Sequence, residues 1–200
     1  MMKRFSLRGI RGVSLQYLLM AALLCGIVVC SCGEKQVELS PEVKAIMSYS
    51  FGQSREPLTV VSDMVVASQG DAEKREYIER QFAQVLRAPG ATYECKDFIC
   101  RQLWFMGTDI SVPALRDMLT DATYSDMARY ALEQNASPNA EKAFRDTLGK
   151  ASGAPLIGII NSIGRRGDEK SVPALEKIAA GVDKEAADAA KSALDKIKGM

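Results

Sequence analysis

One five-residue phrase occurs twice in this chain and limits what the chain can fold into. Residues 111–115 read Ser-Val-Pro-Ala-Leu, and residues 171–175 repeat the same residues in the same order, 60 positions later. An apolar residue follows each copy at helical spacing, Leu119 in the first and Ala179 in the second. An exact internal repeat indicates a fold of stacked repeats, and 60 positions equal two units of about 30 residues, the size of a two-helix repeat.

The composition favours helices over strands. Hydrophobic residues make up 47% and charged residues 26% of the 200 positions, a balance typical of a globular domain with a core. Aromatic residues make up only 6%, and no segment shows the β-branched alternation of a strand hairpin. We therefore expect an all-α fold, an α-α superhelix (a solenoid) of about five antiparallel helix pairs that occupies residues 41–200.

Capping residues and helical periodicity divide this part into about ten helices. The Ser-Pro pairs at 40–41 and 137–138 each combine a hydroxyl cap with a proline that the first helical turn tolerates. Asp183 is a good cap for the last helix, and residues 73–87 form the clearest amphipathic helix. Residues 154–163 are apolar on nearly every side, which predicts an inner helix covered by repeats on both sides.

The same periodicity predicts the surroundings of single side chains. We expect Phe51, Tyr77 and Tyr130 to lie on the apolar faces of their helices. Thr123 and Asp126 are spaced as a variant of the capping box, so we expect them to begin the helix that contains Tyr130.

The first 31 residues predict an export signal. Residues 1–16 contain four basic residues and no acidic one, and residues 17–30 are apolar or small throughout. This run of 14 residues is too short for a comfortable transmembrane span. Residues 29–32 read Val-Cys-Ser-Cys and resemble the bacterial lipobox, and the resemblance implies that Cys32 is lipidated.

We therefore expect a signal peptide over residues 1–31, a tether over residues 32–40 and a membrane-anchored lipoprotein of the bacterial cell envelope. Two alternatives stay open at this point. In one, the signal is cleaved and the protein is released, secreted or periplasmic. In the other, the signal stays uncleaved as the anchor.

The charged and catalytic residues exclude several classes of protein. Without the four basic residues of the leader, 26 − 4 = 22 basic groups stand against 25 acidic ones, a formal charge of −3. Nothing indicates the basic face that a nucleic-acid-binding protein needs. The chain has no histidine, which excludes a Ser-His-Asp triad, histidine acid–base catalysis and histidine-ligated zinc. We expect no catalytic residue, no metal and no cofactor.

Two further phrases accompany the repeated one. Residues 127–132 read Met-Ala-Arg-Tyr-Ala-Leu, and residues 158–166 read Gly-Ile-Ile-Asn-Ser-Ile-Gly-Arg-Arg. Together with the repeated phrase they resemble the bacterial HEAT-repeat family, over residues 41–199 and most strongly after Phe98. The resemblance implies a right-handed superhelix of helical hairpins with a role in protein–protein interaction. The family shares no catalytic residues, so the resemblance implies none here.

These observations favour a non-catalytic interaction or scaffold module of the cell envelope, bound to the membrane through its N-terminal lipid and to a protein partner whose identity the sequence leaves open. The competing interpretation is a HEAT-like accessory subunit of an enzyme assembly, as in the lyases that attach bilins. Export argues against this second interpretation, because the pigment assembly that such lyases serve is cytoplasmic.

Four polar residues are candidates for partner binding. Repeat proteins commonly bind through one face of the stack, and we select Arg129, Asn161, Arg165 and Arg166. The alternative is that these side chains form hydrogen bonds between repeats or belong to solvated, charged turns.

Cys95 and Cys100 are the only cysteines after Cys32. Five residues apart on a helix, they lie about 140° apart around its axis, so they cannot bond to each other without unwinding it. Two interpretations stay open. They are either small, semi-buried residues that behave as hydrophobes, or free thiols that react in an exported protein.

Overall fold

The computed structural model describes residues 36–199. The predicted signal peptide, residues 1–31, and the predicted lipidation site Cys32 lie outside the described residues. Within residues 36–199 the chain forms ten α-helices and one short 3-10 helix, and this part contains no strand. None of the helices in the described part is long and apolar enough to cross a membrane.

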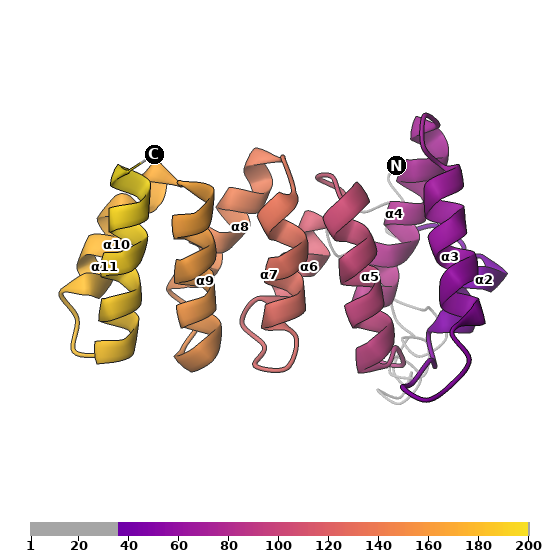
Figure 1. Ribbon diagram of the computed structural model, residues 1–200, viewed down its shortest axis with the longest axis horizontal. Helices are drawn as coiled ribbons and strands as arrows, with labels where there is room; N and C mark the ends of the chain where they lie inside the picture. The colour runs from indigo at the N-terminus through magenta and orange to yellow at the C-terminus, as the bar shows by residue number, and fades with distance from the viewer. Residues whose placement is uncertain (1–35, 200) are drawn as a thin grey trace, which may run out of the picture. The chain divides into compact units, whose positions relative to one another are not determined.

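The helices follow one another as five consecutive pairs, from α2 and α3 to α10 and α11 (Figure 1). They are α2 (Pro41–Ile46), α3 (Glu56–Ala67), α4 (Ala72–Arg87), α5 (Tyr93–Met106), α6 (Val112–Met118), α7 (Ser125–Gln134), α8 (Pro138–Leu148), α9 (Gly153–Arg166), α10 (Val172–Ala179) and α11 (Lys184–Lys198). The 3-10 helix η1 (Glu169–Ser171) leads directly into α10.

The pairs stack so that the helices form two layers. The second helices of the pairs lie side by side, with α3 packed on α5, α5 on α7, α7 on α9 and α9 on α11 (Figure 1). Among the first helices, α4 packs on α6 and α6 on α8. Each pair thus contacts mainly its neighbours in sequence, which is the arrangement of a repeat protein. The structure confirms the predicted all-α solenoid with its five helix pairs.

The predicted helix starts are confirmed by their capping hydrogen bonds. The side chains of Ser40 and Asp183 each accept a hydrogen bond from the backbone amide three residues later, at 3.3 and 3.2 Å. Ser137 accepts one from the amide two residues later, at 2.9 Å. These bonds satisfy amide groups that have no partner inside the helix, and the prolines of α2 and α8 occupy first-turn positions where no such amide is needed.

Helix α9 is the inner helix that the sequence predicts. Ile159, Ile160 and Ile163 are fully buried, because α9 packs on α7 and α8 on one side and on α11 on the other. Gly164 allows the closest approach to α11, since a Cβ atom at this position would lie 2.8 Å from the Cα atom of Ala193. A larger residue in place of Gly164 would force the two backbones apart.

Two aromatic side chains expected on apolar faces lie outside the core. Phe51 is 78% exposed, because α2 already ends at Ile46 and Phe51 belongs to the following loop. Tyr77 is 43% exposed, and its hydroxyl donates a hydrogen bond to the carbonyl oxygen of Glu38 at 2.8 Å. Both expectations were wrong. Helical spacing alone does not show where a helix ends, nor what a side chain at the edge of the apolar face of a helix contacts.

The predicted start of α7 was also wrong in its details. The side chain that accepts hydrogen bonds there belongs to Asp121, which takes them from the amides of Thr123 and Tyr124 at 2.7 and 3.3 Å. Tyr124 itself occupies the cap position and makes no capping bond with its side chain. Tyr130, expected inside, is 43% exposed on the outer side of α7.

The last residues of the predicted tether lie along α4. The amide of Val37 donates a hydrogen bond to the side-chain oxygen of Gln84 at 2.8 Å, and the amide of Ser40 donates one to Gln81 at 2.5 Å. Between them, Leu39 packs against the core. Residues 37–40 therefore form a short extended segment that is hydrogen-bonded to α4 before the first helix begins.

Candidate interaction surface

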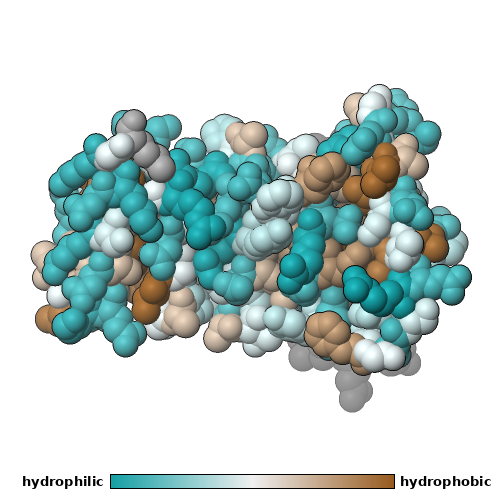
Figure 2. Space-filling model, viewed as in Figure 1, coloured by the Kyte–Doolittle hydropathy of each residue, from teal (hydrophilic) through white to brown (hydrophobic). Residues whose placement is uncertain are grey.

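Exposed apolar side chains gather on the N-terminal three helix pairs. Among the described residues, eight of the nine large apolar side chains that are exposed lie between Phe51 and Tyr130, and the ninth is Val182. Figure 2 shows apolar colour over α3 and α5, whereas the side formed by α9 and α11 is mostly hydrophilic. Single exposed apolar residues are ordinary on a protein surface, but a gathering of them marks a contact region.

Two of these apolar side chains, Trp104 of α5 and Tyr130 of α7, form a compact group with Arg101 of α5, and this group is here called the aromatic ridge. The rings of Trp104 and Tyr130 are stacked, with centroids 5.8 Å apart and an interplanar angle of 19°. The guanidinium of Arg101 lies 5.8 Å from the centre of the Tyr130 ring. Tryptophan, tyrosine and arginine are the residue types that most often dominate binding energy at protein interfaces.

The position of the aromatic ridge is set by helix packing and by one ion pair. Arg101 donates a hydrogen bond to the carboxylate of Asp97 at 2.9 Å, one helical turn earlier on α5. This hydrogen bond, and the negative charge behind it, raise the pKa of Arg101 above its ordinary value, so the guanidinium stays charged. The ridge therefore offers flat aromatic surface beside a permanent cation, held by two packed helices.

A second aromatic pair ties the start of α5 to the start of α7. The rings of Tyr93 and Tyr124 are stacked with centroids 6.2 Å apart. The ammonium of Lys96 lies 4.8 Å from the centre of the Tyr124 ring, and Lys96 itself is buried. This pair helps to fix the separation of α5 and α7, the two helices that carry Trp104 and Tyr130.

Arg129 lies next to the ridge on the outer side of α7, but its guanidinium is occupied by contacts within the protein. It bonds to Asp126, donates a hydrogen bond to the hydroxyl of Ser162 at 3.4 Å and lies 3.9 Å from Glu133. Gly158 of α9 leaves the space that this side chain fills, since a Cβ atom there would overlap the guanidinium. Arg129 thus joins two repeats, and its side chain is only 18% exposed.

Asn161 and Arg165 lie one turn apart on the outer side of α9. Asn161 is half-buried. The side chain of Arg165 is 68% exposed and forms an ion pair with Glu133 of α7. Arg129 also lies near Glu133, so Arg129 and Arg165 approach the same residue of α7.

Arg166 binds the end of α7. Its Nη1 donates hydrogen bonds to the carbonyl oxygens of Leu132, Glu133 and Asn135, at 3.0, 2.9 and 2.9 Å. The last carbonyls of a helix have no partner inside the helix and carry partial negative charge, so a buried arginine stabilises them. The structure thus brings Arg129 and Arg165 to one shared partner, Glu133, places Asn161 one turn before Arg165 on α9, and gives Arg166 a role between repeats.

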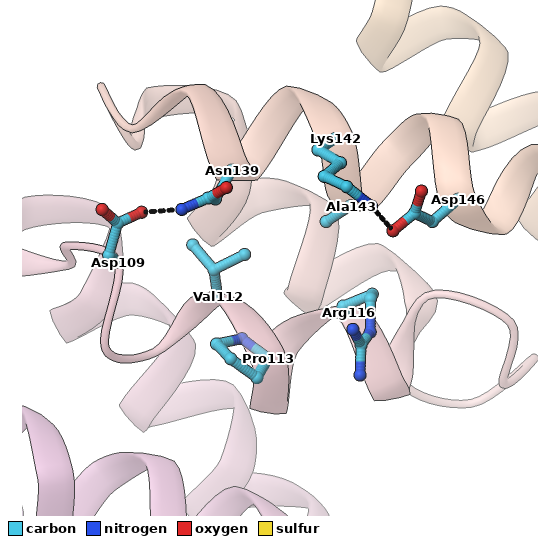
Figure 3. A pocket seen from close by; sticks show the side chains of 8 residues that line it. All are labelled: Asp109, Val112, Pro113, Arg116, Asn139, Lys142, Ala143 and Asp146. Atoms are coloured by element: carbon cyan, nitrogen blue, oxygen red, sulfur yellow. Dashed lines mark hydrogen bonds and ion pairs between the residues drawn. The ribbon is translucent and has the colours of Figure 1, made fainter. Parts of the chain in front are cut away.

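A separate polar pocket lies between α6 and α8 and encloses about 260 Å³ (Figure 3). Each of its charged groups has a partner, and that of Arg116 is Asp117, which does not line the pocket. Asn139 donates a hydrogen bond to Asp109 at 2.9 Å, and Lys142 donates one to Asp146 at 2.6 Å. Within residues 36–199, no group of three acidic, cysteine or histidine side chains is placed to hold a metal ion. The pocket therefore presents a neutralised surface and no free base or nucleophile.

The two cysteines that follow Cys32 lie inside the core of the solenoid. Cys95 and Cys100 are both fully buried and carry free thiols. Burial raises the pKa of the Cys95 thiol to about 12 and raises that of Cys100 as well. Because the thiolate is the reactive form, both side chains act here as small hydrophobes.

Arg101 and Trp104 were not among the candidate residues predicted from the sequence. The signal for Trp104 was present, because it follows the buried Leu103 and precedes the buried Met106 by two positions, off the apolar stripe of α5. Its contact with Tyr130 had no local signal, since it joins residues on different repeats. No protein-family model matches this chain, and no curated protein matches it.

Proposed function

We propose that this chain is a non-catalytic protein–protein interaction module of the bacterial cell envelope, built as a HEAT-like solenoid and anchored by a lipid on Cys32. The aromatic ridge carries this proposal. Trp104 and Tyr130 are the kind of large, rigid side chains that bury much area at little conformational cost, and they stand half-exposed on adjacent helices.

The surroundings of the ridge support a protein as the partner. Asp97 on α5, Asp126 and Glu133 on α7 and Arg165 on α9 add charges of both signs to the two helices that carry the aromatic side chains and to the next helix of the stack. An apolar centre with a polar, solvent-accessible rim is the usual anatomy of a protein interface. The stacked helices hold all these residues in fixed relation, so little order needs to be gained on binding.

Site-specific photocrosslinking in the native host tests this proposal. A photoreactive phenylalanine analogue at position 104 or 130 should yield one discrete adduct, identified by mass spectrometry. The same analogue at Val182, exposed on the opposite part of the solenoid, is the matched control and should not yield that adduct. Identical adduct patterns from all three positions, or no adduct from either ridge position, would show that the ridge is not an interface.

The lipid anchor has a test of its own. Cys32→Ser should abolish labelling by radioactive fatty acid and move the protein out of the membrane fraction. One acyl chain gives only marginal membrane binding, so loss of the modified cysteine removes stable anchoring altogether. Cys30→Ser is the matched control, because position 30 precedes the proposed site by two residues and should leave the labelling intact. Undiminished labelling of Cys32→Ser would refute the anchor without affecting the proposed interface.

A further inference from the structure

A groove with an apolar floor runs between α3 and α5, on the same face as the aromatic ridge. It encloses about 290 Å³ and is here called the α3–α5 groove. Figure 2 shows apolar surface between these two helices, framed by hydrophilic side chains. Its lining residues are Tyr49, Phe51, Arg55, Leu58, Glu94 and Phe98, together with the ion pair of Asp97 and Arg101.

The groove lies beside the loop that follows α2, the shortest α-helix among the described residues. Helix α2 has only six residues, and the loop from Met47 to Arg55 takes the place of further turns. Helix α3 consequently packs on α5 less closely than α5 packs on α7. The loop is nevertheless held in position, since the amide and hydroxyl of Thr92 donate hydrogen bonds to the carbonyls of Met47 and Tyr49, at 2.9 and 2.5 Å.

Phe51 stands at the rim of the groove with most of its ring in water. It is 78% exposed, the largest exposed fraction of any aromatic side chain in the described part of the chain. Gly52 follows with φ of 92°, a conformation that favours glycine and turns the loop sharply there. A phenylalanine presented in this way, beside an apolar floor that includes Phe98, indicates a surface that is covered when a partner binds.

The rim also carries two charges of opposite sign. Among the described residues, neither Arg55 nor Glu94 forms an ion pair, whereas Asp97 and Arg101 neutralise each other. Arg55 lies where α3 begins and Glu94 lies in the first turn of α5. A partner that fills the groove would therefore meet a free cation along one side and a free anion along the other.

The shape and the charges of the groove favour side chains of a protein as its occupant. The groove encloses about 290 Å³ and is open along its length between the two helices. An open groove between two helices is the shape that receives the apolar face of an amphipathic helix.

We propose that the α3–α5 groove binds an amphipathic helix of the partner protein, with a large apolar side chain placed against Phe51, Leu58 and Phe98. Acidic residues on one flank of that helix face Arg55, and basic residues on the other flank face Glu94. This inference rests on the proposed function, because it treats the α3–α5 groove as one part of the proposed protein-binding surface and states what kind of segment binds there.

Three synthetic peptides of 16 residues test the groove by fluorescence polarisation against the full chain in detergent. All three carry the same stripe of leucine and phenylalanine, and their flanks are acidic on one side and basic on the other, acidic on both, or basic on both. The mixed peptide should bind most tightly. Phe51→Ala should weaken its binding about tenfold, since a centrally packed aromatic side chain is lost. Because Phe51 is exposed, this variant should keep the stability of the parent protein.

Charge reversal at the rim makes the test specific. Arg55→Glu leaves two acidic groups at the rim and should transfer the preference to the basic peptide, and Glu94→Lys should transfer it to the acidic peptide. Each change should amount to about twofold to fivefold in affinity, because exposed ion pairs are weak. The matched controls are Val182→Ala and Lys177→Glu, both on exposed positions of the last helix pair, and they should leave all three affinities unchanged.

An unchanged order of the three peptides in every variant would overturn the inference, as would an equal loss of binding in Val182→Ala and Phe51→Ala. The proposed function fails by a different observation, the absence of an adduct at positions 104 and 130. If the adduct persists while the peptides fail to discriminate, the interface stands and the groove is not part of it.

Discussion

Helices α6 and α10 begin with the same five residues and yet differ in burial. In both, the leading serine has φ of −84° with a small negative ψ, and Leu115 and Leu175 are fully buried. Ala114, however, is fully buried, whereas Ala174 is exposed. The reason is position, because α6 lies between α4 and α8, while α10 packs mainly on η1 and α11 at the end of the stack.

The two copies also differ in what holds their first turn. The amide of Ser111 donates a hydrogen bond at 3.1 Å to Glu79, a buried residue of α4 that also accepts two bonds from Thr108. The hydroxyl of Ser171 donates one at 2.6 Å to Asp168, only three residues earlier. The five repeated residues therefore determine how the helix begins and which leucine packs inside its helix pair. The neighbouring repeats determine whether its other side chains are buried.

Replacing the alanine of the repeated phrase by an acidic residue should produce the largest difference in stability between the two copies. Ala114→Asp buries a carboxylate between α4, α6 and α8 and should lower the free energy of unfolding by about 3–5 kcal/mol. Ala174→Asp is the matched variant, and it should change that free energy by less than about 0.5 kcal/mol because the position is exposed. Urea unfolding followed by circular dichroism measures both. Equal losses would mean that α10 is covered on its outer side.

Truncating the leucine of the repeated phrase should destabilise the protein in both copies, because Leu115 and Leu175 are both fully buried. Leu115→Ala and Leu175→Ala should each lower the free energy of unfolding by about 2–5 kcal/mol. The loss at Leu115 should be the larger one, since its surroundings are enclosed by neighbours and cannot relax as the end of the stack can. A neutral result at either position, measured by thermal and urea unfolding, would show that the two helices are not structurally equivalent.

The terminal pair depends on one close contact, and a single methyl group tests it. Gly164→Ala should destabilise by about 1–3 kcal/mol, because the new Cβ atom meets the backbone of Ala193 on α11. The change in helix propensity alone would stabilise α9 by about 1 kcal/mol, so the sign of the effect decides whether the helices really touch there. Gly149→Ala has open space around its Cβ position and serves as the control in the same melting experiment.

The labelling rates of the two buried thiols provide the smallest expected difference between the two copies of the phrase. Burial raises the pKa of the Cys95 thiol to about 12, so the thiol is protonated near pH 8 in the folded protein and a thiol reagent modifies it only when the chain opens. Leu115→Ala should therefore raise the labelling rates of Cys95 and Cys100, read by peptide-level mass spectrometry, more than Leu175→Ala does. Terminal repeats open without disturbing distant ones, and the reverse order of rates would contradict this independence.

Local chain properties explain which features could be predicted. Ser40, Ser137 and Asp183 cap helices because their side chains reach amides two or three residues away. The burial of α9 followed from residues 154–163 being apolar on nearly all sides, which leaves such a helix only the interior. The repeated phrase predicted the stack itself, because identical segments with helical spacing cannot bury their apolar faces alone.

Most of the helices, the caps at Ser40, Ser137 and Asp183, and the solenoid could thus be predicted from the sequence, because they depend on residues within one or two turns and on the repeated phrase. The stacking of Trp104 on Tyr130 and the binding of Arg166 to the end of α7 emerge only in the folded chain. The same holds for the burial of Ala114 and the exposure of Ala174. These features depend on residues that lie about 30 positions apart in the sequence. Only the stacking of one repeat on the next brings such residues into contact.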